Sequence, residues 1–166
     1  MNFKVDISTY ILTVVTLIIG WFLNILAMRF ASKRTQELEK KKLLQTKIEE
    51  LANLVYEVEK SYRKLWGEIA VNHFSSKQPL NMDGINLPFD KIQILINFYF
   101  PQLKPAYNDL VKEKDSFGEK IFPTLREGDE KKRSELFKDI TRTHGRLEKA
   151  CENICSLSSG ISQEIM

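Results

Sequence analysis

An uncharged run of nineteen residues, Tyr10 to Met28, limits what this chain can fold into more than any other part of its sequence. Eleven of these residues are Ile, Leu, Val or Phe. At about 1.5 Å rise per residue, a helix of this length spans roughly 28 Å, close to the ~30 Å hydrocarbon core of a bilayer. The sequence therefore predicts a transmembrane helix over residues 10–30, preceded by a short segment, residues 1–9, outside the cytoplasm.

Charges beside the predicted span indicate its orientation. The first nine residues carry one Lys and one Asp, and no small-residue cleavage site of a signal peptide follows the apolar run. Basic residues outnumber acidic ones just after the span: Arg29, Lys33, Arg34, Lys40, Lys41 and Lys42 stand against Glu37 and Glu39. The positive-inside rule then places residues 31–166 in the cytoplasm, beneath the inner (cell) membrane.

The net charge of +3 is small, and much of it lies next to the span. Attraction to anionic lipid headgroups accounts for the run Lys40–Lys42 more simply than nucleic acid does. We therefore expect the lipid bilayer as a partner and no direct contact with nucleic acid.

Polar and small residues recur along one face of the predicted span. At successive spacings of three or four, this face holds Thr9, Thr13, Thr16, Gly20, Asn24, Ala27 and Ala31. Thr can bond its own helix backbone, so a simple anchor is one interpretation. An Asn amide in lipid needs a partner or water, and this favours self-association or several copies around a water-filled path. Thr9, Thr13, Thr16, Gly20 and Asn24 are the candidate residues for an oligomer interface or pore lining.

A heptad pattern follows without a helix-breaking residue in between. Its positions alternate by four and three: Leu44, Ile48, Leu51, Val55, Val58, Tyr62, Leu65 and Ile69. We call these eight residues the seam. The pattern predicts a helix continuous with the span, or joined to it by a kink near Ala31, and ending near Phe74. The seam can assemble several copies, or it can be buried in the bundle of one chain.

The remaining sequence predicts three more helices. Residues 75–88 contain Pro79, Gly84 and Pro88 and indicate a loop. An apolar helix then lies between Pro88 and Pro101, with residues 89–100 as either monomer core or an intersubunit contact. The next helix runs from Ala106 to about Phe122, ended by Pro123 and Gly128, and the last starts near Asp129. The predicted fold class is all-α, with one transmembrane helix continuing into a cytosolic bundle of about four helices.

The sequence lacks the common catalytic motifs, including a phosphate-binding glycine loop, G-x-S-x-G, H-E-x-x-H and paired C-x-x-C. His144, Cys151 and Cys155 share a helix face, but a zinc site needs a fourth ligand and closer spacing. In a reducing compartment the two cysteines are expected to be free thiols. We expect no metal, no cofactor and no enzymatic activity.

A helical ribonuclease of the HEPN type is the remaining enzymatic alternative. Such nucleases carry an Arg that is separated from a following His by four to six intervening residues. Residues 66–68 before His73 are Trp, Gly and Glu, and residues 137–139 before His144 are Phe, Lys and Asp. This alternative therefore requires that Arg63, Arg142 or Arg146 meet a histidine through the fold.

In layout, the chain resembles the small membrane accessory proteins of bacterial RNA-targeting (type VI) CRISPR systems. These have one N-terminal membrane helix, a cytoplasmic helical domain described as divergent HEPN, and ring-like pores. The resemblance covers the span, the long helix and the bundle, but it rests on no specific motif. Because the Arg–His spacing of the nucleases is missing, no catalytic residue can be assigned from this resemblance. It implies a homo-oligomeric pore or membrane-disrupting assembly in antiviral defence. The alternatives are a membrane-anchored scaffold that recruits a cytosolic effector protein, or a divergent membrane-bound ribonuclease.

Overall fold

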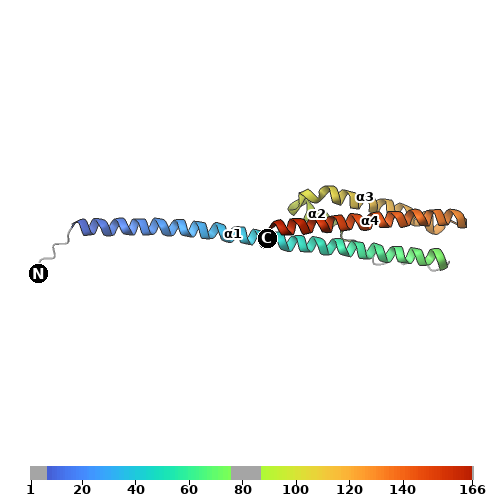
Figure 1. Cartoon of the computed structure of the whole chain (residues 1–166), viewed down its shortest axis with the longest axis horizontal. Helices are drawn as coiled ribbons and strands as arrows, with labels where there is room; N and C mark the ends of the chain where they lie inside the picture. Colours follow the sequence, from blue (N-terminus) through green and yellow to red (C-terminus); the bar gives the residue numbers. More distant parts are fainter. Residues whose placement is uncertain (1–6, 76–86, 166) are drawn as a thin grey trace. The chain divides into compact units, whose positions relative to one another are not determined.

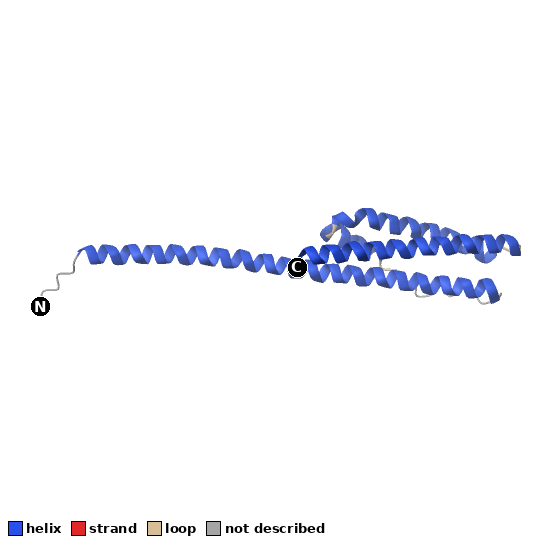
Figure 2. Ribbon diagram, in the orientation of Figure 1, coloured by secondary structure: helices blue, strands red, loops and turns tan. Residues whose placement is uncertain are grey.

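A computed structural model describes residues 7–75 and 87–165 of the chain (Figure 1). Every regular element within these residues is helical, so the predicted all-α class is confirmed (Figure 2). The chain divides into two compact units, residues 1–43 and residues 44–166, and each is treated by itself below. Most of the predicted loop, residues 76–86, lies outside the described residues.

The described part of the first unit is the N-terminal part of helix α1, which runs from Ile7 to Ser75. Side chains from Thr13 to Leu43 are exposed, except that Ile25 and Leu26 are half-buried. The exposed set includes large apolar side chains such as Leu17 and Trp21. This part of α1 is long and apolar enough to cross a membrane.

The second unit combines the C-terminal part of α1 with three further helices and a 3₁₀ turn. The bounds are α2, Phe89–Tyr99; η1, Pro101–Leu103; α3, Lys104–Arg126; and α4, Glu130–Ile165. Helices α3 and α4 pack side by side more closely than any other pair in the bundle (Figure 1). The turn between them is closed by Asp129, whose Oδ1 accepts a bond from the Lys132 N–H at 2.9 Å. This N-terminal cap explains why α4 begins where the sequence predicts.

Helix α3 does not end at Pro123, so that prediction is wrong. The helix continues to Arg126 with Pro123 inside its last turn. A proline removes one backbone N–H, and near a helix end few further bonds depend on the turn that it disturbs. The hydroxyl of Thr124 donates to the Lys120 carbonyl at 2.7 Å and supplies a side-chain bond at the same turn. The helix also begins at Lys104, slightly before the predicted start, with Pro105 in its first turn.

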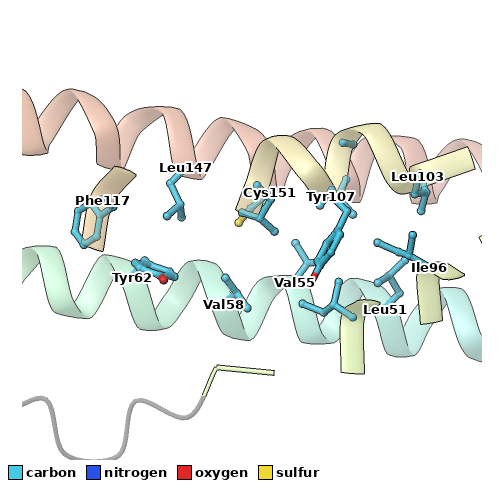
Figure 3. Close-up of a cluster of buried hydrophobic side chains, with 14 of the residues drawn as sticks. Leu51, Val55, Val58, Tyr62, Ile96, Leu103, Tyr107, Phe117, Leu147 and Cys151 are labelled. Carbon is cyan, nitrogen blue, oxygen red and sulfur yellow. The ribbon is translucent and has the colours of Figure 1, made fainter. Parts of the chain in front are cut away.

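One hydrophobic core holds the second unit together (Figure 3). The seam side of α1 supplies one wall, and α2, α3 and α4 supply the others. Phe100 and Phe117 are the largest fully buried side chains. The ring of Tyr62 meets the ring of Phe117 edge-on, with centroids 5.4 Å apart, which joins α1 to α3.

Candidate functional site: a polar face on the apolar part of α1

The polar face predicted from the sequence lies on the exposed part of α1. Thr13, Thr16, Gly20 and Asn24 are all exposed, as are Ala27 and Ala31, whereas the side chain of Thr9 lies outside the described residues. A Cβ added at Gly20 would meet nothing within 4 Å, so the space beside this position is open within the single chain. Small residues of this kind allow two membrane helices to approach closely.

Asn24 is the most polar side chain on this face. It is exposed, and its amide forms no hydrogen bond with any residue that the structure describes. In hydrocarbon, an amide without a partner is costly to bury, by several kcal/mol on apolar transfer scales. A second helix or water can supply the missing hydrogen bonds. Asn24 is therefore the residue on this face that most needs a hydrogen-bond partner from outside its own helix.

The seam is buried within the chain's own bundle. Seven of its eight residues, Ile48 to Ile69, are buried in the hydrophobic core, and Leu44 packs against that core as a half-buried residue. While the bundle is folded, these side chains are not available to a second copy. The sequence allows the seam either to assemble several copies or to be buried in the bundle of one chain. The structure shows it buried in the bundle of one chain.

Helix α2 presents two different faces. Ile92, Leu95 and Ile96 are buried in the core, as is Phe100 just after the helix. Ile94 and Phe98 lie one helical turn apart on the other side, and Phe98 is 79% exposed. The apolar stretch at residues 89–100 is therefore core along one face only.

His144 lies at the point where α1, α3 and α4 meet. It is 6% exposed, and its ring stacks on Trp66 of α1 with centroids 5.3 Å apart. Phe117 of α3 approaches it at 6.0 Å. Burial lowers the pKa of His144, an effect that the nearby Glu148 carboxylate opposes. Its Nε2 atom makes no hydrogen bond with the described residues.

The fold does bring an arginine into the neighbourhood of His144. Arg63 of α1 donates through Nε to Glu148 at 3.3 Å, and the other oxygen of Glu148 lies 3.7 Å from Nδ1 of His144. Arg146 instead contacts Glu113 at 2.8 Å. His73 stacks on Phe137 at 4.2 Å. Because the imidazole of His144 is enclosed, this cluster does not present an open Arg–His pair to an RNA phosphate.

The two cysteines are free thiols, with Cys151 buried and Cys155 half-buried. Burial raises the pKa of Cys151 to about 12 and also raises the pKa of Cys155. A neutral thiol is a poor metal ligand and a poor nucleophile. In the described part of the chain, no group of three or more His, Cys, Asp or Glu side chains is placed to hold a metal ion.

Sequence reasoning missed a polar network between α3 and α4. Lys120 pairs with Asp139 at 2.9 Å and also donates to the buried hydroxyl of Thr143 at 2.9 Å. Arg146 donates to the same hydroxyl at 3.2 Å, and Glu113 completes the network. A threonine at a core-facing position of α4 was the available signal, because a buried hydroxyl requires partners.

Comparison with models of protein families, with curated proteins and with solved structures finds nothing that matches this chain.

Proposed function

We propose that this protein is a non-enzymatic, single-pass membrane protein that self-associates through the polar face of α1. Its C-terminal bundle lies in the cytoplasm, and its spanning helices form a pore or membrane-disrupting assembly. The exposed amide of Asn24 within an otherwise apolar helix is the observation that carries the proposal. Several copies could bond these amides to one another or to water held between them.

Burial of the seam supports a membrane location for the contact between copies. A seam facing solvent would have offered a second, cytosolic interface, but its side chains are in the core of the bundle. From Thr13 to Met28, the apolar part of α1 instead has every side chain exposed except those of Ile25 and Leu26. Association through small and polar residues needs no further apolar burial, because lipid is as apolar as the helix surface.

A role in bacterial antiviral defence is part of the proposal. It follows from the layout shared with the membrane accessory proteins of type VI CRISPR systems, which combine one span with a helical cytoplasmic domain. The order of elements in this chain, an apolar exposed helix followed by a helical bundle, is consistent with that layout.

The assembly can be tested by the mass of the full-length protein in detergent, together with ion flux from vesicles that contain it. We expect an oligomer and a measurable flux, both reduced by Asn24→Leu. Phe22→Leu is the matched control, because Phe22 is exposed on the opposite side of the same helix. A monomeric mass, or equal effects of the two substitutions, would contradict the proposal.

A membrane-anchored scaffold is the second candidate function. The exposed pair Ile94 and Phe98 on α2 favours it, because Phe98 is 79% exposed and aromatic residues, including Phe, are enriched at protein interfaces. Replacing the span by an unrelated poly-Leu helix separates the two functions. A scaffold would keep its activity in this chimera and lose it on Phe98→Ser, whereas a pore would lose its activity in the chimera.

A further inference from the structure

Two sets of basic side chains lie on opposite sides of α1 just beyond the apolar segment. All of them are exposed and belong to the first unit. At about 100° per residue, Arg29, Lys33 and Lys40 fall within about 40° of one another and roughly opposite Gly20. Arg34, Lys41 and Lys42 fall within about 60° of Gly20, on the side of the polar face. The basic residues therefore divide equally between the polar face and the face opposite to it.

We propose that Arg29 and Lys33 bind the phosphates of anionic phospholipids at the cytoplasmic leaflet. The inference rests on the membrane insertion and self-association proposed above. If the polar face meets other copies, the opposite face of each helix meets lipid, and Arg29 and Lys33 lie on that opposite face.

The height of these residues fits the headgroup layer. At about 1.5 Å per residue, Lys33 lies about 7 Å beyond Met28, and the polar layer of each leaflet is about 5–8 Å thick. Arg29 lies at the edge of the hydrocarbon, where its stem can remain in the apolar region while its guanidinium reaches the phosphates. Lys40 lies about 18 Å beyond Met28, farther than the Debye length of about 8 Å at physiological salt. The lipid contact is therefore assigned to Arg29 and Lys33, and not to the run Lys40–Lys42, for which the sequence alone predicts it.

The chemistry of the partner follows from the charges. Exposed Lys and Arg beside a bilayer attract anionic headgroups about fivefold more strongly per charge than neutral ones. Glu37 and Glu39, the acidic residues in this part of α1, lie farther along the helix and between the two basic faces. Phosphatidylglycerol is a suitable probe because its headgroup carries the anionic phosphate without a compensating amine.

The test uses the full-length protein in phosphatidylcholine vesicles that contain a trace of spin-labelled phosphatidylglycerol or spin-labelled phosphatidylcholine. The fraction of label immobilised at the protein surface is measured for each lipid. We expect phosphatidylglycerol to be enriched several-fold at low salt and the enrichment to disappear at 0.5 M NaCl, where charges are screened over roughly 4 Å. Equal immobilisation of the two lipids would overturn the proposal.

Lys33→Gln and Arg34→Gln form a matched pair, because these neighbours differ by about 1.5 Å in height and about 100° around the helix. We expect Lys33→Gln to reduce the enrichment about three- to fivefold and Arg34→Gln to change it by less than about twofold. Equal losses from both variants in a protein of oligomeric mass would overturn the lipid inference alone. Equal losses together with a monomeric mass would overturn the proposed assembly, and with it the division of α1 into two faces.

Discussion

The indole ring of Trp66 stacks on the imidazole ring of His144, with centroids 5.3 Å apart and ring planes inclined by 26°. Trp66 belongs to α1 and His144 to α4, so the pair joins the seam helix to the last helix of the bundle. Polar contacts surround it: Arg63 bonds Glu59 and Glu148, and the Trp66 Nε1–H donates to Thr141 at 3.4 Å. A titratable group thus lies at a contact between these two helices.

This arrangement predicts that the bundle loses stability as the pH falls below about 6.5. Burial lowers the pKa of His144 below the ordinary value of 6.5; the charge of Arg63 adds to this effect, while Glu148 and Glu59 oppose it. The unfolded chain therefore binds a proton more readily than the folded one, and stability is lost from the unfolded pKa downwards through the folded pKa. One such group can change the free energy of unfolding by at most about 1.4 kcal/mol per pH unit.

Urea unfolding of the full-length protein in detergent between pH 7.5 and pH 5.5 measures this dependence. His144→Gln should flatten it, because the buried titrating group is removed. Burial also lowers the pKa of His73, with Arg133 contributing, so His73→Gln serves as the comparison. An unchanged pH dependence in His144→Gln would refute the assignment.

Two phenylalanines with opposite environments should respond differently to truncation. Phe117 is fully buried and contacts the rings of Tyr62 and His144, whereas Phe98 is 79% exposed. Phe117→Ala should destabilise the bundle by about 3–5 kcal/mol, through lost burial and the cavity that remains. Phe98→Ala should change the free energy of unfolding by less than about 0.5 kcal/mol. Thermal unfolding followed by far-UV circular dichroism compares the two, and similar losses would mean that Phe98 is buried in solution.

The hydroxyl of Thr143 should contribute more to stability than that of Thr141. Thr143 is fully buried and accepts bonds from Lys120 and Arg146, while Thr141 is exposed. Thr143→Val removes that acceptor from two cationic donors and should cost about 1–3 kcal/mol. Thr141→Val should cost about 0.5 kcal/mol or less, because water can replace the hydroxyl. Equal midpoints of denaturant unfolding for the two variants would show that the α3–α4 network does not depend on Thr143.

The two thiols should differ in their rates of alkylation. Cys151 is fully buried with a pKa raised to about 12, and Cys155 is half-buried. At pH 8, iodoacetamide should therefore modify Cys155 first and Cys151 only when the bundle opens. Mass spectrometry of peptides over time measures both rates, and denatured protein, in which the rates converge, is the control. Faster modification of Cys151 would contradict its burial.

Much of the fold follows from local patterns in the sequence. The alternating spacing from Leu44 to Ile69 is sufficient to predict both a helix and its buried face, since apolar residues three and four apart share one side. Asp129 marks the start of α4 because its side chain satisfies a free backbone N–H. Pro123 was misjudged because the rule that proline ends helices applies to interior turns, and this residue lies in the last one.

Other features depend on tertiary packing that a pattern does not encode. The seam residues can be buried equally well against their own chain or against a second copy, because the hydrophobic effect is non-directional. The pattern alone therefore does not say which of the two occurs. The neighbours of His144 come from α1 and α3, so its helix-face partners Cys151 and Cys155 gave no indication of the aromatic stack. The network around Thr143 requires the register between α3 and α4, which is fixed by packing across the whole pair.

The internal burial of the seam has a consequence for how folding responds to dilution. Proteins whose apolar surfaces are completed only by a partner subunit melt at temperatures that rise with protein concentration. Here α1 completes its seam against α2, α3 and α4 of the same chain. Unfolding of the bundle is then a unimolecular reaction, and the melting temperature of the bundle should be the same in dilute and in concentrated samples.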